Sequence, residues 1–371
     1  MGLNKYKLGD LIELCDERNS YRYNNFYGLN INKEFMPTWA NTEGLDESKY
    51  KVVRKKRFVF SGMQTGRDEC IRISMYGGEE PIIVSPAYTT FEIAREDIVL
   101  PEYFFMLFLS KEKDRLGAFC SDGSVRSNLD WERFCDFEII LPSIEQQRKY
   151  VDVYLALQNN LAVYQSKAEE LKLVCDGYLD KLKVENEKLK IGEFIEQYDK
   201  RNSDNRLKLN SVKGISTEKS FIDTKADMNG VGLTSYKVVE TNTFVYVPDT
   251  SRRGDKMAIA LNRGEEPVLV SSIYTTFKSK DTSKLLPEYL FMFFDCPEFD
   301  RYARFNSWGS AREVFTMDDM NNVEIPIPDI KVQQEIVNIH KCYIERQRIA
   351  DALKEQINNI CPVLIRGSLI E

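Results

Sequence analysis

The residue types that most often perform catalysis or bind metals are sparse in this sequence of 371 residues. His340 is the only histidine, so a nucleophilic cysteine–histidine pair or a histidine-containing zinc site would have to use it. The apolar spacing around His340 predicts a helix, on whose face a histidine is more often structural. The eight cysteines form no C-x-x-C pair and lie at positions 15, 70, 120, 135, 175, 296, 342 and 361. We therefore predict neither a cysteine nucleophile nor a metal site.

Motifs of enzymes that act on nucleotides or nucleic acids are also absent or incomplete. Residues 62–67 contain two glycines but lack the lysine and the Ser/Thr of a phosphate-binding loop, so we interpret them as a hairpin turn. The sequence has no Asn/Asp-Pro-Pro-aromatic tetrapeptide of the kind that amino-methyltransferases use. Neither Pro248-Asp249 nor Pro328-Asp329 is followed by the acidic-x-Lys of a nuclease. We expect a chain that is not an enzyme by itself and holds no cofactor.

Binding chemistry is present instead, once in each half of the chain. A tyrosine with two threonines follows an apolar run at 88–90 and again at 274–276. A Gly-Ser-x-Arg turn at 123–126 and 309–312 adds a guanidinium, which binds both phosphate and the major-groove edge of guanine. Short basic clusters could follow a phosphate backbone. The candidate DNA contacts are Lys55, Lys56, Arg57, Arg67, Tyr88, Thr89, Thr90, Ser124, Arg126, Arg252, Arg253, Tyr274, Thr275, Thr276, Ser310 and Arg312.

Each of these features also has a structural interpretation. The cluster of Lys55, Lys56 and Arg57 could be a solvated edge, and Tyr88 and Tyr274 could be core residues. The repetition of the whole set in both halves favours binding.

The two halves of the chain are copies of each other. Residues 78–91 recur as residues 264–277, a shift of 186, and ten of the fourteen positions are identical. Near the start of the chain the shift is 183, since Leu8-Gly9-Asp10 corresponds to Ile191-Gly192-Glu193. The halves differ most at 21–49 against 204–235. Two domains that recognise different sequences would differ in this way, and so would duplicated domains that changed by neutral drift.

Each copy is too long for a solenoid repeat and predicts a domain followed by a long helix. Short apolar runs between glycines and prolines predict a strand-rich α+β body with one buried helix, at 101–109 and 287–294. Strands at 137–141 and 323–327 lead into the long helices. The predicted domains are residues 1–142 and 187–328, with long spacer helices at 143–186 and 329–371.

The long helices carry apolar stripes at heptad spacing, which predicts that they form an antiparallel coiled coil with pseudo-twofold symmetry. Ser143 can cap the first helix, of about 40 residues and roughly 60 Å. Pro362 should end or kink the second. The predicted interface comprises Tyr154, Leu157, Leu161, Tyr164, Leu171, Tyr178, Ile336, Ile339, Tyr343, Leu353 and Ile357, and the stripe of the second helix continues to Ile360.

Composition excludes some functional classes. No apolar run approaches the roughly 18 residues that cross a bilayer, and the unpaired cysteines favour a reducing, cytoplasmic location. A net charge of −7 argues against a protein coated in nucleic acid but allows a local basic face.

Residues 141–147 (Leu-Pro-Ser-Ile-Glu-Gln-Gln), their weaker copy at 327–334 and the order globule, helix, globule, helix resemble the specificity subunit of type I restriction-modification enzymes. The copy departs from the family pattern, because Lys331-Val332 replaces the usual acidic residue. The resemblance implies two target recognition domains, each reading one half of a bipartite DNA site in bacterial defence. It also implies partner modification (adenine methyltransferase) and restriction subunits, which would hold S-adenosylmethionine and ATP with Mg²⁺. Residues 144–147 would be a docking point for a modification subunit.

Two other functions remain open from the sequence. A coiled-coil assembly scaffold would use the same helices without recognising DNA. An acidic DNA-mimic inhibitor would fit the negative charge, although its carboxylates should cluster on one face and here both signs are interspersed.

Overall fold

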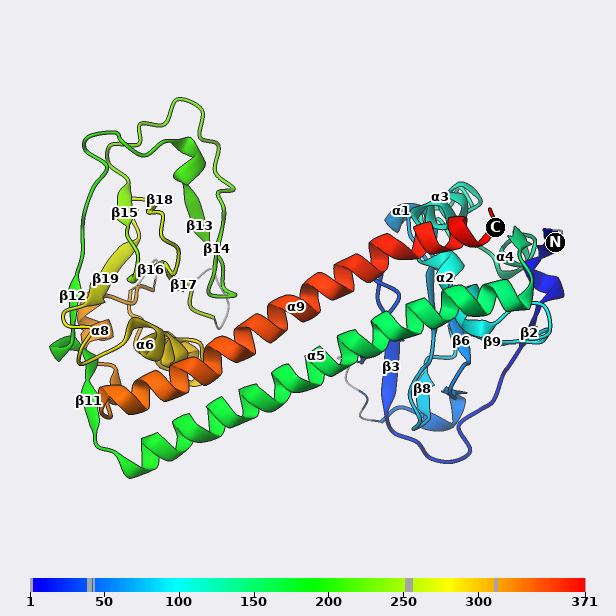
Figure 1. The fold of residues 1–371 in the computed structure, drawn as a ribbon, viewed down its shortest axis with the longest axis horizontal. Helices are drawn as coiled ribbons and strands as arrows, with labels where there is room; N and C mark the ends of the chain where they lie inside the picture. The colour runs from blue at the N-terminus through cyan, green and yellow to red at the C-terminus, as the bar shows by residue number, and fades with distance from the viewer. Residues whose placement is uncertain (1–2, 39–41, 43, 251–255, 310–312, 371) are drawn as a thin grey trace. The chain divides into compact units, whose positions relative to one another are not determined.

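The computed structural model describes residues 3–38, 42, 44–250, 256–309 and 313–370 (Figure 1). The chain forms two compact units. Unit 1 contains Met1–Gln165 and Gln347–Glu371, and unit 2 contains Ser166–Arg346. Each unit therefore includes one globule and a part of each long helix. None of the helices in the described ranges combines the length and the apolar character needed to cross a bilayer.

The globule of unit 1 is built on two four-stranded sheets. The first has the order β2-β9-β6-β7 and the second the order β4-β3-β8-β5. Its strands are β1 (Asn4–Lys7), β2 (Ile12–Leu14), β3 (Phe26–Leu29), β4 (Phe35–Pro37), β5 (Lys51–Val53), β6 (Phe58–Ser61), β7 (Arg72–Met75), β8 (Ile82–Val84), β9 (Thr89–Ile93) and β10 (Glu138–Leu141). Its helices are η1 (Leu8–Asp10), η2 (Glu47–Lys49), α1 (Thr65–Asp68), α2 (Pro101–Phe108), α3 (Lys111–Phe119) and α4 (Trp131–Cys135).

Aromatic packing joins the first sheet to α2. Phe58 of β6 stacks on Phe91 of β9 with ring centroids 5.0 Å apart, and Phe104 of α2 meets Phe58 edge-on at 5.3 Å. All three rings are fully buried. Pro101 at the first helical turn of α2 is favourable, because its missing N–H would have no partner there. The buried helix predicted at 101–109 is therefore present.

Unit 2 repeats most of this plan. Strands β12, β19, β16 and β17 form its four-stranded sheet, and β15-β18 and β13-β14 are separate pairs. The strands are β11 (Lys188–Lys190), β12 (Ile195–Gln197), β13 (Lys213–Ile215), β14 (Phe221–Asp223), β15 (Lys237–Val239), β16 (Thr243–Tyr246), β17 (Ile259–Leu261), β18 (Val268–Val270), β19 (Thr275–Ser279) and β20 (Glu324–Pro326). The helices are η3 (Ile191–Glu193), η4 (Leu209–Ser211), α6 (Pro287–Phe294), α7 (Pro297–Phe305) and α8 (Met317–Asn321).

A buried ion pair is repeated in both units. In unit 1 the carboxylate of Asp114 accepts from Lys33 Nζ at 2.6 Å and from the backbone N–H of Ile71 at 3.0 Å. In unit 2 the carboxylate of Asp300 lies 2.9 Å from Lys219 Nζ and accepts from the backbone N–H of Met257 at 3.0 Å. These residues are related by the sequence shift of 186, so the duplication preserved the interior contacts.

The two long helices are α5 (Ile144–Glu185) and α9 (Ile330–Ser368). Figure 1 shows α5 in green and α9 in orange to red. The hydroxyl of Ser143 accepts from the backbone N–H of Gln146 at 3.3 Å and caps α5 as predicted. In unit 1 the beginning of α5 packs with the end of α9, and in unit 2 the end of α5 packs with the beginning of α9. The predicted antiparallel pairing of the long helices is confirmed.

Burial along the helices follows the heptad stripes. The predicted interface residues are all buried or half-buried, whereas Ile360 is 37% exposed. Its neighbour Cys361 is fully buried instead. The buried stripe advances by four residues from Ile357, so including Ile360 in it was wrong.

Of the two predicted effects of Pro362, an end or a kink of α9, the first was wrong, because the helix continues to Ser368. The residues after the proline are held by the core of unit 1, where Leu364 and Ile365 pack. Ser368 is 1% exposed, and its hydroxyl lies 2.6 Å from the hydroxyl of Tyr103 on α2. This burial stabilises the last turns despite the backbone hydrogen bond that a proline removes.

A buried glutamine fixes the start of each long helix. The amide of Gln147 donates to the carbonyls of Ile98 (2.8 Å) and Pro142 (2.9 Å) and accepts from the backbone N–H of Leu100 (3.0 Å). Gln333 makes the corresponding three bonds in unit 2, at 2.8, 2.9 and 2.9 Å. Both glutamines are fully buried. The second glutamine of Gln146-Gln147 and the first of Gln333-Gln334 therefore connect the long helices to their globules.

We predict that Gln147→Leu lowers the free energy of unfolding of unit 1 by about 3 kcal/mol, because three buried backbone groups lose their partner. Urea denaturation of the full chain measures the effect. Lys149→Ala, at an exposed position on the same helical turn, is the control and should change little. A Gln147→Leu variant as stable as the control would contradict the assigned role.

His340 occupies the position in α9 that Tyr154 occupies in α5. It is half-buried, and its ring lies 5.7 Å from the ring of Tyr343. The pKa of His340 is lowered from its usual 6.5 to about 4, mainly by burial and also by the positive charge of Arg263, against the opposing effect of Asp176. His340 is therefore neutral in the folded protein near neutral pH.

This pKa predicts a stability that decreases in acid. Below pH 6.5 the unfolded chain protonates His340 while the folded chain does not, so unfolding becomes easier as the pH falls toward 4. Between pH 7.5 and pH 5 this histidine should account for up to about 2 kcal/mol of lost stability. His340→Gln should show a correspondingly smaller loss in urea titrations at the two pH values. Equal losses in both proteins would refute the prediction.

Candidate nucleic-acid interface

A loop cluster forms where β6 ends. It consists of residues 62–69, which include α1, and residues 121–129, and we call it the reading loops. The carbonyl of Gly62 accepts from the N–H of Leu129 at 2.9 Å, and the N–H of Gly66 donates to the carbonyl of Ser127 at 3.0 Å. A Cβ on Gly62 would lie 1.9 Å from the carbonyl oxygen of Leu129, and one on Gly66 would lie 2.0 Å from Ser127 Oγ. The two glycines therefore allow close approach of the second loop. The first loop, residues 62–69, joins the antiparallel strands β6 and β7 and contains the helical turn α1.

The carboxylate of Asp122 orders the second of these loops. It accepts from the hydroxyl of Ser124 at 2.6 Å and from the backbone N–H groups of Ser124 and Asn128 at 3.1 and 3.0 Å. The hydrogen bond from the Ser124 hydroxyl is the main reason that the pKa of Asp122 is lowered. Sequence reasoning missed Asp122, although Asp-Gly-Ser is a typical sequence for a turn closed by an aspartate side chain. Ser124 is thus exposed but already engaged within its loop.

The reading loops display two arginines. Arg67 and Arg126 are exposed, and neither guanidinium has an ion-pair partner elsewhere in the described part of the chain. The two loops that carry these arginines are joined by the backbone hydrogen bonds described above. Two guanidinium groups without ion-pair partners therefore lie on an ordered backbone, which suits recognition of phosphate or guanine.

The two candidate tyrosines lie partly in the core. Tyr88 is half-buried against the small second core of unit 1, and its hydroxyl accepts from the backbone N–H of Leu29 at 3.3 Å. Thr89, also half-buried, pairs with Phe60 of β6, which places it at the same end of the sheet as the reading loops. Tyr274 and Thr275 are half-buried in unit 2. Any contact of these residues with DNA remains a prediction.

Three candidate DNA contacts are interior residues, and including them was wrong. Arg57 is 5% exposed, and its guanidinium pairs with Glu17 at 2.8 Å and Glu92 at 2.7 Å. Thr90 and Thr276 are 1% and 0% exposed. Their hydroxyls donate to backbone carbonyls of the neighbouring segment, at Cys15 and Tyr198. These side chains hold the sheets together and cannot reach a duplex.

Lys55 and Lys56 lie at the other end of β6 from the reading loops. Lys55 is exposed and pairs with Glu79, and the ammonium of Lys56 is 3.7 Å from Glu102. Strand β6 separates them from Gly62, so the structure does not bring them together with Arg67 and Arg126.

The reading loops of unit 2 correspond to residues 248–255 and 307–315, of which the structure describes 248–250, 307–309 and 313–315. The N–H of Phe315 donates to the carbonyl of Pro248 at 2.9 Å, which corresponds to the bond between Leu129 and Gly62. The N–H of Thr250 donates to the carbonyl of Glu313 at 3.0 Å. The candidates Arg252, Arg253, Ser310 and Arg312 lie outside the described residues.

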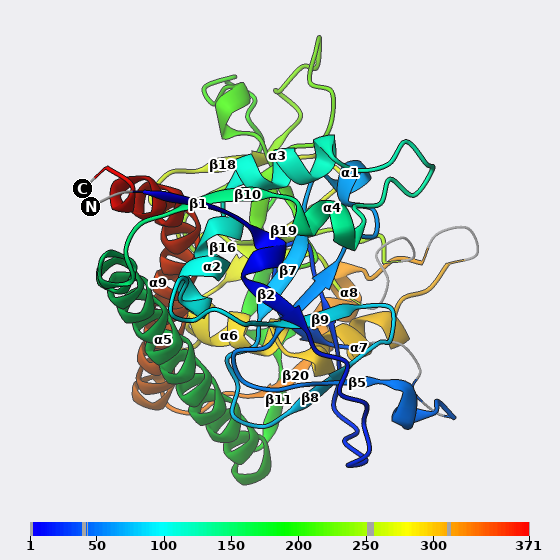
Figure 2. The ribbon, with the colours of Figure 1, turned by 90° about the vertical axis from the view of Figure 1, so that its right-hand side faces the viewer.

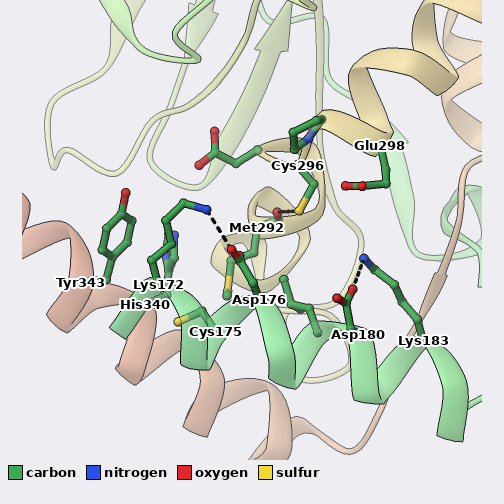
Figure 3. A pocket seen from close by; sticks show the side chains of 13 residues that line it. Lys172, Cys175, Asp176, Asp180, Lys183, Met292, Cys296, Glu298, His340 and Tyr343 are labelled. Atoms are coloured by element: carbon green, nitrogen blue, oxygen red, sulfur yellow. Dashed lines mark hydrogen bonds and ion pairs between the residues drawn. The ribbon is translucent and has the colours of Figure 1, made fainter. Parts of the chain in front are cut away.

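A pocket of about 300 Å³ in unit 2 brings His340 near two cysteines, Cys175 and Cys296 (Figure 3). Burial raises the pKa of the Cys296 thiol to about 11 and also raises that of Cys175. Burial lowers the pKa of His340, so all three groups favour their neutral forms. A catalytic pair needs a thiolate and an imidazolium, which this environment disfavours.

Four charged residues of the pocket are paired along α5. Lys172 lies 2.8 Å from Asp176, and Lys183 lies 2.8 Å from Asp180, as Figure 3 shows. The thiol of Cys296 contacts the carbonyl of Met292 at 3.2 Å. Across the described residues, no three His, Cys, Asp or Glu side chains gather in a way that could hold a metal ion. The reading loops are therefore the stronger candidate for a functional site.

Comparison with known proteins identifies the family. The model of the type I restriction modification DNA specificity domain matches twice, over residues 2–173 and 183–359. No curated protein matches the sequence. Among solved structures, the S subunit of a type I restriction-modification system from M. genitalium aligns over 99% of this chain and 96% of its own, with 12% identity and a TM-score of 0.59.

Two further solved structures align over 99% of this chain. One is the HsdS subunit from Thermoanaerobacter tengcongensis, with 15% identity, 96% coverage of its own chain and a TM-score of 0.36. The other, with 14% identity, 98% coverage and a TM-score of 0.43, comes from work on complex assembly and conformational transition of the type I R-M system. The similarity to the M. genitalium subunit supports the fold. The two family matches, which together include almost the whole chain, show that it belongs to the type I restriction-modification specificity subunits, which are non-catalytic on their own and recognise a bipartite DNA target.

Proposed function

We propose that the reading loops of each unit are the surface that reads one half of the bipartite target. The observation that supports this most directly is the pair of exposed arginines, Arg67 and Arg126, on an ordered loop backbone. Arginine is the side chain best suited to bind phosphate and the guanine edge. A rigid scaffold with variable loops also allows one fold to read different sequences.

The chemistry belongs to partner subunits in this proposal. Two modification subunits would bind S-adenosylmethionine and methylate adenine, and restriction subunits would bind ATP and Mg²⁺ and cleave. The chain itself would choose the site and orient the modification subunits on it. The start of α5 is a weaker candidate for docking than its sequence suggests, because Gln147 is buried within unit 1, whereas Glu145 is exposed.

Mapping methylated adenines tests this function. We expect that co-expression of the chain with its modification subunits produces methylation at one split sequence of two defined halves. Exchanging residues 1–140 for those of another specificity subunit should change one half and preserve the other. An unsplit motif, or a change in both halves, would contradict modular reading by two domains.

Substituting an arginine tests the assigned surface. We predict that Arg126→Ala weakens binding through the first half-site and relaxes its sequence preference by about 1–3 kcal/mol, the usual value of a base contact. Arg312→Ala should act in the same way on the second half-site. Binding of the reconstituted complex to duplexes altered in one half measures both effects. Arg95→Ala is the control, because Arg95 is exposed, pairs with Asp97 and lies outside the reading loops. Unchanged half-site preference would remove the two arginines from the site.

A further inference from the structure

Helices α3 and α7 carry an exposed arginine and an exposed phenylalanine at equivalent positions. The shift of 186 relates Arg115 to Arg301 and Phe119 to Phe305. The phenylalanines are 87% and 79% exposed, and the arginine side chains are 77% and 70% exposed. Arginine and phenylalanine are four residues apart, so they share one face of the helix.

The retained aspartates of these helices have a role inside the units, whereas the arginine and the phenylalanine have none. Glu112 and Glu298 are retained as well, as the exposed partners of the arginines. Asp114 and Asp300 form the buried ion pairs described above. The arginines contact Glu112 at 3.6 Å and Glu298 at 3.1 Å, but both partners in each pair are highly exposed. Exposed pairs of this kind contribute little to stability and can be exchanged for another anion. Folding therefore does not explain why two large exposed side chains were retained in both copies.

The helix end that carries the phenylalanine adjoins the reading loops. Figure 2 shows α1 and α3 side by side in unit 1. A Cβ on Gly117 of α3 would meet the side chains of Ile71 and Thr65 at 2.4 and 3.3 Å. The hydroxyl of Ser121 donates to the carbonyl of Gly117 at 2.9 Å, and Ser307 makes the equivalent bond to Ala303 at 2.6 Å. This geometry fixes Phe119 beside the reading loops of unit 1, and Phe305 precedes the same turn at the end of α7.

The residues that make the two half-sites different must differ between the units, whereas residues that contact what both half-sites share can be identical. The shared part of a duplex is its sugar–phosphate backbone. We propose that Arg115 with Phe119, and Arg301 with Phe305, form a sequence-independent contact to the DNA backbone, the guanidinium on a phosphate and the ring against the adjacent sugar. This inference rests on the proposed function of the reading loops.

A modification subunit is the other partner that both units could share. The position of α3 favours DNA, because this helix contacts α1, which carries the exposed Arg67, and its end leads into the loop of Arg126. An exposed Arg–Glu pair can also release its arginine to a phosphate, which binds the fork more strongly. Assembly of the complex is therefore measured alongside DNA binding.

The test uses the complete complex of the chain with its modification subunits. Two double variants, Arg115→Ala with Arg301→Ala and Phe119→Ala with Phe305→Ala, are titrated by fluorescence anisotropy with a duplex carrying the mapped target and with a scrambled duplex. Salt is varied from about 50 to 200 mM KCl. The controls are Arg95→Ala and Leu14→Ala, exposed positions where the second copy has Asp281 and Gln197. Gel filtration reports whether the modification subunits remain bound.

The arginine variant should weaken both duplexes by the same factor and reduce the slope of log K against log salt by about 1.8, since two phosphate contacts are lost. The phenylalanine variant should weaken both duplexes by about fivefold or more without changing the slope, and Phe119→Tyr with Phe305→Tyr should restore binding. If the alanine variant at phenylalanine unfolds, the arginine variant alone decides.

Three outcomes would overturn the inference: unchanged affinity in the arginine variant, a loss confined to the target duplex, or dissociation of the modification subunits. A wild-type complex that binds both duplexes equally would contradict the proposed function. Parallel losses on both duplexes would then still support a backbone contact.

Discussion

The buried amide of each long-helix glutamine is the interaction on which the rest of the structure depends. Gln147 is the first member of the buried stripe that continues through Val151, Tyr154 and Leu161. Two of its three hydrogen bonds tie the first turns of α5 to the segment just before α2. Since a helix can rotate about its axis, this attachment determines which face meets the core. The heptad stripe can then pack on α9 only in one register.

The duplication separates what the fold requires from what it leaves free. The glutamine amide, the Asp–Lys pair and the threonine-to-carbonyl bond occur in both units with the same partners. Each satisfies a buried polar group, whose loss would cost free energy. The exposed side chains of the loops, such as Arg67 and Arg126, carry no such obligation, because they end in water. Substitutions could therefore accumulate in the loops while these buried contacts stayed constant. Two copies of one fold can recognise two different DNA sequences only if their loops vary in this way.

Sequence patterns predicted the elements well and the side-chain environments poorly. Heptad spacing found both long helices and their pairing, and proline at the first turn marked α2. Periodicity could not show that Arg57 and Thr90 point inward, because strands of three to five residues give little alternation to read. Likewise, the helix propensity of proline predicts a break at Pro362. The burial of Ser368 and its neighbours is a tertiary contact that the propensity does not include, and it keeps the helix intact. Of the reading loops, the arginines were found and the organising carboxylate of Asp122 was not.

The net charge of −7 does not conflict with DNA binding, because charge acts locally in salt water. The screening length is about 8 Å at physiological ionic strength, so a phosphate responds mainly to the groups it meets. Many lysines and arginines of the described residues lie within 4 Å of a carboxylate, as Lys55 does with Glu79. Arg67 and Arg126 have no such partner within the described ranges, and the nearby carboxylate of Asp122 is engaged by its own loop. The potential at the reading loops therefore depends on Arg67 and Arg126 together with the carboxylates of Asp68, Glu69 and Asp122, and not on the total charge of the chain.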